Sequence, residues 1–402
     1  MTMTSRMLGT AGGRRVWAVV TLVMMLLLPT RSAVAFDLSE WVPGLRVSPF
    51  ISERFEYESN VFQTPSHAKD DLIFKTIPGF LAEYGTGPHW VTLGYRAEIL
   101  NFLDLNNQDA VHHILLGQLH LEFNRLSLNV RDNFVHTTDP PGTELVGRIE
   151  STTNTLATDA EYRLTDRFAV GANATWVHVE YPVLPQLDRE EYLFGGSVFW
   201  KFQPKTDLRL TYNYGVKEFN SDTIRDVTRH VVLLGIRGEL TSKLSSTFRI
   251  GYEDRQPNGP GPLPRGYRGI VGGGDWVYQA TERLRITLLT DRSVQESIFA
   301  NELFFISTMG TLAVEQRIGP KVSVTARLTG GENAYPTKSQ VGDNTPFKFR
   351  NDIIVGWGGG IGYDVQPWLR VAVDFLHSDR DSNFRRFSFK DDKISAMITL
   401  QF

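Results

Sequence analysis

The chain of 402 residues contains no cysteine, which excludes disulfide frameworks, thiolate metal sites and cysteine nucleophiles. Beyond residue 35 it also lacks any apolar run near the roughly 20 residues that a membrane-spanning helix needs. A hydrophobic period of 3.6 residues, the mark of an amphipathic helix, is missing too. The rest of the chain is therefore either soluble or crosses a membrane as β-strands.

The amino terminus has the features of an export signal. Arg14 and Arg15 precede an apolar run over residues 16–28, and Ala-Val-Ala at residues 33–35 follows as a small-x-small cleavage site. The run of about 13 residues is too short to span a bilayer. These features predict a signal peptide over residues 1–35, and an exported chain without cysteine suits the oxidising periplasm.

The charge balance argues against nucleic acid as a partner. The chain has 42 Lys and Arg side chains against 45 Asp and Glu. Removal of residues 1–35 takes away four arginines and no acid, which leaves 38 basic against 45 acidic groups and a net charge of −7. Proteins that bind nucleic acids carry a basic surface, and this chain is mildly acidic.

Apolar and polar residues alternate along almost the whole chain. One clear case is Leu208, Leu210, Tyr212, Tyr214 and Val216, with Arg209, Thr211, Asn213, Gly215 and Lys217 between them. A period of two places the two sets on opposite faces of a sheet. Segments of about 10–14 residues match tilted membrane strands, whereas strands of soluble domains average about 5–6 residues. We count about eighteen segments, near residues 45–58, 70–84, 89–102, 110–123, 126–138, 152–164, 168–181, 189–202, 207–219, 227–240, 245–255, 267–278, 284–297, 303–318, 322–335, 347–365, 369–380 and 388–402.

The connections between these segments alternate in length. Short ones, rich in Gly, Pro, Asn and Asp, include residues 85–88, 124–125, 165–167, 203–206, 241–243, 319–321 and 366–368. Long ones include residues 59–69, 139–151, 256–265 and 336–346. Bacterial single-chain barrels have short periplasmic turns, long extracellular loops and an even number of strands. The sequence therefore predicts an all-β fold, a transmembrane antiparallel up-and-down β-barrel over residues 36–402.

The carboxyl terminus supports closure of such a barrel. The chain ends on an alternating strand whose apolar side is Ile394, Ala396, Ile398, Leu400 and Phe402. A terminal strand frays unless it is paired, and in a barrel it pairs with the first strand. Aromatic residues gather near both the short turns and the long loops, as in the girdles at the two surfaces of an outer membrane.

The polar faces of the strands predict a hydrated lumen. We expect these lumen-lining residues: Arg96, Glu98, Arg131, Arg209, Lys217, Arg237, Glu239, Arg249, Glu253, Arg285, Asp291, Arg327, Arg370 and Asp374. Arg or Lys facing lipid at the midplane costs about 2–4 kcal/mol, whereas in a wet interior these groups stay hydrated. For each residue alone, packing and hydration is the default role; together they line a polar passage. Inward glycines at positions 356, 358, 360 and 362 indicate a bend or a widened lumen.

No catalytic, metal or cofactor site is predicted. His112 and His113 are adjacent in one strand and point to opposite faces, so they cannot grip one ion. Asp379, Asp381 and Asn383 offer oxygen ligands in an outer loop, for which a solvated loop is the default interpretation. The glycine stretches do not precede helices and are not phosphate loops.

Several short motifs resemble the opening of the outer-membrane β-barrel porin family that is associated with exopolysaccharide export clusters. They are Pro49-Phe50-Ile51, Tyr57-Glu58-Ser59-Asn60-Val61-Phe62, Ile77-Pro78-Gly79-Phe80 and Leu93-Gly94-Tyr95-Arg96-Ala97-Glu98. The resemblance is best over residues 45–102 and continues only as strand rhythm to Phe402. Leu400-Gln401-Phe402 is similar to the outer-membrane assembly signal, although Met397 stands where such signals often have glycine.

The resemblance implies a bacterial outer-membrane location and a non-catalytic passage for a secreted exopolysaccharide. We expect outer-membrane lipid and lipopolysaccharide as partners, with a polysaccharide cargo and periplasmic export proteins implied by the resemblance. Three alternatives stay open: a general porin for small solutes, an outer-membrane enzyme with residues at the barrel mouth, and a closed structural barrel.

Overall fold

The computed structural model describes residues 42–140, 147–221, 223–258, 266–298, 302–339 and 347–402. The predicted signal peptide, residues 1–35, lies outside them. Within the described residues the chain forms strands β1(Leu45–Glu58), β2(Asp71–Thr86), β3(His89–Phe102), β4(Ala110–Glu122), β5(Leu126–Thr137), β6(Ser151–Arg163), β7(Phe168–Glu180), β8(Arg189–Gln203), β9(Thr206–Phe219), β10(Val227–Glu239), β11(Leu244–Pro257), β12(Tyr267–Thr281), β13(Leu284–Glu296), β14(Phe304–Ile318), β15(Val322–Ser339), β16(Lys348–Gln366), β17(Leu369–Ser382) and β18(Phe389–Gln401). The helical elements in this part of the chain are the short 3-10 turns η2(Asn106–Gln108), η3(Pro185–Leu187), η4(Thr223–Arg225) and η5(Arg385–Phe387).

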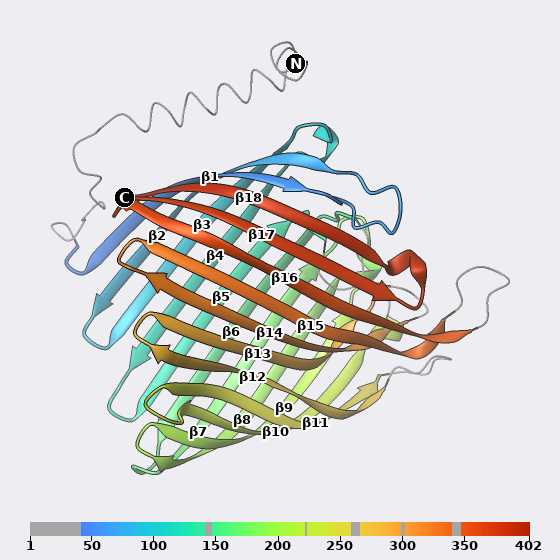
Figure 1. The fold of residues 1–402 in the computed structure, drawn as a ribbon. Helices are drawn as coiled ribbons and strands as arrows, with labels where there is room; N and C mark the ends of the chain where they lie inside the picture. Colours follow the sequence, from blue (N-terminus) through green and yellow to red (C-terminus); the bar gives the residue numbers. More distant parts are fainter. Residues whose placement is uncertain (1–41, 141–146, 222, 259–265, 299–301, 340–346) are drawn as a thin grey trace, which may run out of the picture.

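The strands form one closed antiparallel wall of eighteen strands (Figure 1). Each strand pairs with its neighbours in the sequence, and β18 pairs with β1 through nine residue pairs, from Phe50 opposite Gln401 to Glu58 opposite Lys393. The amide of Phe402 donates to the carbonyl of Pro49 at 2.9 Å. The predicted barrel and its strand count are thus confirmed. No helix among the described residues is long and apolar enough to cross a bilayer.

Alternation along the strands gives the wall one apolar and one polar face. Leu210, Leu234 and Ile250 form a continuous row across β9, β10 and β11, and their side chains are 53%, 55% and 47% exposed. On the opposite face, Arg209 and Arg249 flank Gly235 in the same way. Large apolar side chains that are exposed in register over many strands mark the lipid-facing side of a membrane barrel.

The connections confirm the predicted alternation of length. The turns after β2 and β14 contain Gly87 and Gly319 with φ of 64° and 65°, a left-handed conformation that favours glycine. Among the described residues, all four 3-10 turns lie at the opposite, long-loop end of the wall. The sequence did not predict these turns, because each is only three residues long.

Three of the long-loop connections contain the same hydrogen bond between a backbone amide and a side chain. The amide of an aromatic residue at a strand end donates to an aspartate seven residues later: Phe102 to Asp109, Tyr181 to Asp188 and Phe219 to Asp226, at 2.7–2.8 Å. Each bond spans a 3-10 turn. The carboxylate therefore satisfies the amide of the residue at the strand end, which keeps these loops compact.

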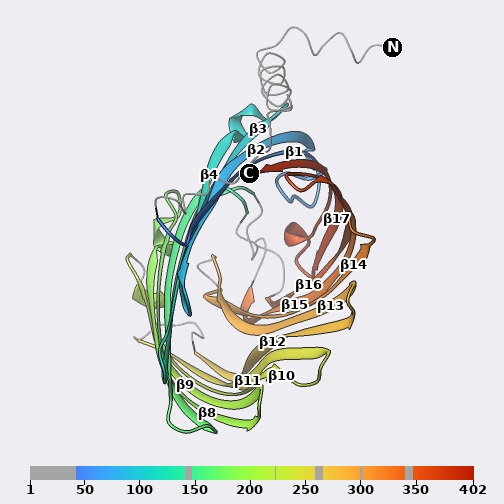
Figure 2. The same ribbon diagram turned by 90° about the vertical axis from the view of Figure 1, so that its left-hand side faces the viewer.

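The wall opens along one seam at the long-loop end. The β12–β13 ladder begins at Gly272 opposite Arg292, although β12 starts at Tyr267 and β13 continues to Glu296. Beyond that point the long-loop ends of β13 and β14, which we call the β13–β14 tip, turn inward, where Val294 and Phe304 are buried and Phe304 meets Tyr267 edge to face. Figure 2 shows the result: β8 to β12 curl into a lobe of their own beside the wall formed by β13 to β17.

Candidate functional site: the polar lumen

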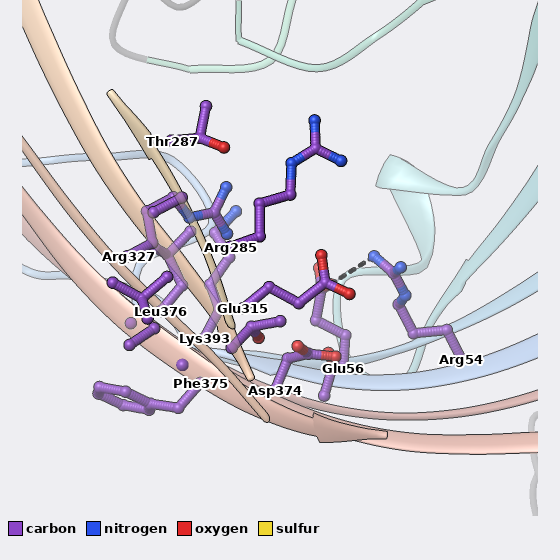
Figure 3. A pocket seen from close by; sticks show the side chains of 17 residues that line it. Arg54, Glu56, Arg285, Thr287, Glu315, Arg327, Asp374, Phe375, Leu376 and Lys393 are labelled. Carbon is purple, nitrogen blue, oxygen red and sulfur yellow. Dashed lines mark ion pairs between the residues drawn. The ribbon is translucent and has the colours of Figure 1, made fainter. Parts of the chain in front are cut away.

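The larger lobe of the lumen holds a cavity of about 520 Å³ (Figure 3). Strand β1 and strands β13 to β18 build its walls, so both ends of the chain contribute. Four basic and three acidic side chains line it, which sum to a formal charge of +1: Arg54, Arg285, Arg327 and Lys393, with Glu56, Glu315 and Asp374. Charges of both signs in one cavity keep it hydrated and give it no strong preference for either sign of solute.

The acids of β1 are partly neutralised by lysines. Glu56 accepts from Lys75 Nζ at 2.7 Å and lies 3.8 Å from Arg54. Glu58 lies 2.6 Å from Lys393 Nζ. Arg285 and Glu315 stand opposite each other in the β13–β14 register, and Figure 3 shows both side chains reaching into the cavity.

Glycines in β16 make room for charged side chains of β17. A Cβ atom on Gly360 would collide with the carboxylate of Asp374, and one on Gly362 with the guanidinium of Arg370. Gly360 pairs with Asp374 in the β16–β17 register, whereas Gly362 pairs with Ala372 and lies diagonally across from Arg370. These two inward glycines therefore leave room for the charged side chains beside them, and a wider lumen stays a prediction.

A cluster of buried charges crosses the lumen at the long-loop end. Lys217 Nζ on β9 lies 2.9 Å from Glu296 Oε1 on β13 and 3.1 Å from Glu191 Oε2 on β8. Arg255 on β11 donates to both carboxylate oxygens of Glu296, at 2.8 and 2.9 Å. The side chains of Lys217, Glu296 and Arg255 are 8%, 8% and 2% exposed. We call this the extracellular bridge.

The extracellular bridge is possible only because the wall is folded. Strands β9 and β13 are separated by four strand spacings, about 19 Å along a sheet. A lysine and a glutamate cannot span that distance on a flat wall, so the inward turn of the β13–β14 tip brings Glu296 to Lys217.

A second bridge lies near the short-turn end, in the lobe that β8 to β12 form, which we call the narrow lobe. Arg237 Nη2 on β10 lies 3.0 Å from Glu161 on β6 and 2.9 Å from Asp207 on β9. The same guanidinium lies 4.8 Å from the ring centroid of Phe199 on β8. Four strand spacings again separate β6 from β10, so this periplasmic bridge holds the narrow lobe closed. Between the two bridges a space of about 230 Å³ is lined by Asp159, Arg209 and Arg249, among others.

The predicted lumen residues occupy different parts of this interior. Arg285, Arg327 and Asp374 line the large cavity, and Arg209, Arg237 and Arg249 line the narrow lobe. Lys217 belongs to the extracellular bridge, and Glu253 is buried beside it on β11. The remaining six lie in local pairs or at strand positions along the wall: Arg96 bonds Glu98, Arg131 lies 3.9 Å from Asp159, Glu239 pairs with Lys205 at the short-turn end, Arg370 pairs with Asp364, and Asp291 accepts from Ser293.

Alternation missed Glu296 and several charges that face outward. Glu296 is an even number of residues from the lipid-facing Leu288, so strict alternation along β13 would place its side chain on the outward face. The inward turn of the β13–β14 tip places it in the lumen instead. Arg292 and Asp132 do lie on the outward face, since they pair in register with Gly272 and with the exposed Leu156. The sequence analysis did not identify these outward charges. One signal was present: the three glycines from Gly272 mark where the seam opens.

The described residues contain no group of three or more His, Asp or Glu side chains that could hold a metal ion. His112 is buried and its Nε2 lies 3.0 Å from the hydroxyl of Thr138, while His113 stacks on Tyr95, a residue of the outward face. The two adjacent histidines thus point to opposite faces, as predicted.

Comparison with known proteins places this barrel in a family. Solved structures with a similar fold include OccAB3 of Acinetobacter baumannii (12% identity, 90% of this chain and 100% of that chain, TM-score 0.47) and two Pseudomonas aeruginosa proteins. The first is OpdK with vanillate (12% identity, 89% of this chain and 99% of that chain, TM-score 0.47). The second is OpdQ (10% identity, 90% of this chain and 99% of that chain, TM-score 0.47). No curated protein matches the chain. The family model described as "Putative beta-barrel porin 2" matches residues 45–402, which is the whole closed wall. The chain therefore belongs to this porin family, and the protein lies in the outer membrane.

Proposed function

We propose that the protein is a passive, non-catalytic channel for small hydrophilic solutes. Membership in a porin family supports a channel, and the large charged cavity supports a hydrophilic cargo. Its volume of about 520 Å³ falls within the roughly 300–1,000 Å³ of sites that hold small molecules. This cavity, enclosed by a wall whose apolar face is turned to lipid, is the observation that carries the proposal.

The lumen favours weak, exchangeable contacts over tight binding. A solute that enters the cavity meets guanidinium donors of Arg285 and Arg327 and carboxylate acceptors of Glu315 and Asp374. Each hydrogen bond to the wall replaces a bond to water, so its net contribution is small, about 0.5–1.5 kcal/mol. A solute can therefore pass from one group to the next without being trapped.

The exopolysaccharide cargo rests on the sequence resemblance alone. The two bridges tie β6 to β10 and β9 to β13, which divides the lumen and narrows the path that a polymer would need. A small solute needs only the larger lobe. The geometry therefore favours the small-solute alternative over a polymer.

Enzymatic chemistry finds little support in the same geometry. Among the residues that the structure describes, the closest pair of a histidine and an acid is His178 Nδ1 and Glu190 Oε1 at 2.6 Å, which lies beside Trp176 on the lipid-facing side of the wall. A catalytic pair has to face the solute that it acts on.

A swelling assay with purified protein in liposomes tests the proposal. We expect rates to fall steadily from arabinose to glucose to sucrose, with dextran excluded. Thr287→Trp places a large side chain in the cavity and should slow every sugar several-fold, whereas Leu288→Trp on the outward face should not. Equal entry of dextran and glucose would favour a polymer path, and no swelling with any sugar would contradict the channel.

A further inference from the structure

A groove of about 600 Å³ lies along the seam, on the side of the wall that faces lipid. Ile250, Ile270 and Ile353 form its apolar walls and are 47%, 57% and 54% exposed. Strands β13, β14 and β15 form its floor, where Gly310 stands opposite Gly330. These two glycines share the outward face with Leu312 and Leu328, which are two residues away and 41% and 54% exposed.

The hollow exists because side chains are missing from its floor. A Cβ atom on Gly330 would meet nothing within 4 Å, and one on Gly310 would touch only carbonyl oxygens at 3.9 Å. Backbone packing therefore does not require glycine at either position. A large apolar residue, as found along most of the outward face, would fill the groove.

Arg292 lies in this groove, and only some of its N–H donors form hydrogen bonds to the wall. Its Nε donates to the carbonyl of Ile270 at 3.1 Å, where the β12–β13 ladder has ended, and its Nη1 donates to the hydroxyl of Thr308 at 2.5 Å. The Ile270 carbonyl also accepts from the hydroxyl of Tyr267 at 2.9 Å, so both bonds together satisfy this strand edge, which a membrane does not otherwise tolerate. The two bonds from Arg292 use two of the five N–H donors of a guanidinium. An acid on the same face, Glu332, stands opposite Thr308 in the register.

We propose that the groove binds one acyl chain of an outer-leaflet lipid, with the anionic phosphate of its headgroup on Arg292. An empty apolar groove in a bilayer must be filled by hydrocarbon, since a void loses its dispersion contacts. A phosphate complements the guanidinium, which binds such oxygens through paired N–H donors. Arg292 lies four residues from the long-loop end of β13, so the headgroup belongs to the outer leaflet.

Native mass spectrometry of delipidated protein, titrated with dioleoyl phosphatidic acid or dioleoyl phosphatidylcholine, tests this site. We expect one tightly bound phosphatidic acid per barrel and weaker binding of phosphatidylcholine. The variant Gly310→Leu/Gly330→Leu should weaken that tight site at least about tenfold, because two leucines occupy the space of the chain. Arg292→Gln should remove the preference for the anionic lipid, and Glu332→Gln should increase it.

Gly196→Leu is the matched control. Gly196 is also an exposed, outward glycine, with only one oxygen at 4.0 Å from its Cβ position, but it lies on β8, away from the groove. It should leave the tight site unchanged, and resistance of each variant to unfolding in detergent shows that its barrel is intact. Equal lipid binding by wild type and the double glycine variant would overturn the proposal. So would a wild-type dimer that the double variant dissociates, because the groove would then be a subunit contact. Neither result bears on passage of solutes through the lumen.

Discussion

Lys217 and Glu296 meet at 2.9 Å although four strand spacings separate β9 from β13. Both side chains are almost fully buried, and Arg255 holds the same carboxylate with a two-pronged contact. Glu296 thus fixes the β13–β14 tip against the opposite wall. We therefore expect the width of the channel mouth to depend on this acid.

Glu296→Gln is expected to open the mouth and destabilise the barrel. Loss of the carboxylate leaves Arg255 buried without the acid that it bonds and leaves Lys217 with Glu191 as its remaining partner, and breaking a buried pair in this way costs about 3–5 kcal/mol. The tip should detach, so that single-channel conductance rises while the thermal unfolding temperature in detergent falls. Glu239→Gln is the control, because its partner Lys205 is 69% exposed and a surface pair contributes about 0–1 kcal/mol. Unchanged conductance in Glu296→Gln would show that the tip does not constrict the lumen.

Charge changes in the large cavity should shift ion selectivity in opposite directions. Arg327→Gln removes a cation from the lining, and Asp374→Asn removes an acid. At about 7 Å in water one charge changes the energies of K⁺ and Cl⁻ by about 0.6 kcal/mol in opposite directions, so each permeability should change about two- to threefold and their ratio by about the square of that factor. Reversal potentials in a tenfold KCl gradient measure this shift, towards cations for the first variant and towards anions for the second. Shifts of the same sign in both would mean that ions follow another path.

Gly195→Val should destabilise the narrow lobe without affecting the outer surface. Gly195 lies between Asn173 and Asn213, whose side chains bond at 3.3 Å across it, and a Cβ atom there would collide with both. Overpacking of this kind costs typically about 1–3 kcal/mol. Urea unfolding followed by tryptophan fluorescence should show this loss, and Gly196→Ala, one residue away on the outward face, should unfold like wild type.

Arg350→Lys should loosen the long-loop end of β16. The Arg350 guanidinium makes two hydrogen bonds to Asp352 and lies 4.3 Å and 3.5 Å from the ring centroids of Tyr335 and Phe387. Lysine keeps the charge but supplies neither the planar fork nor the stacking. We expect faster proteolysis of the loops joined to β16 and β18, with the transmembrane strands still protected. A cleavage rate equal to that of wild type would mean that charge alone is enough there.

The sequence predicted what depends on local pattern. Alternation in segments such as Leu208 to Val216 gave the strands, their faces and the count of eighteen, and the short turns gave their order. Closure followed from the last strand, which ends at Phe402. These features depend on residues within one strand or on pairing between adjacent strands, and alternation with a period of two encodes them directly.

The pinched lumen could not be predicted, because it depends on contacts between distant strands. Nothing in the alternation of β13 distinguishes Glu296 from Leu288, and Arg237 gives no sign that it reaches Glu161 four strands away. Such contacts follow from how a large wall folds on itself, which the hydrogen-bond register does not fix. The lipid-facing groove was missed for another reason: its floor depends on Gly310 and Gly330 standing opposite each other, which requires the register of β14 and β15.

Single-channel recording of the purified wild-type protein in a planar lipid bilayer tests the central account most directly. A hydrated lumen with charges of both signs predicts discrete, ohmic conductance steps with weak ion selectivity, blocked reversibly by small sugars. A membrane that stays at its bare conductance after insertion of folded protein would contradict it.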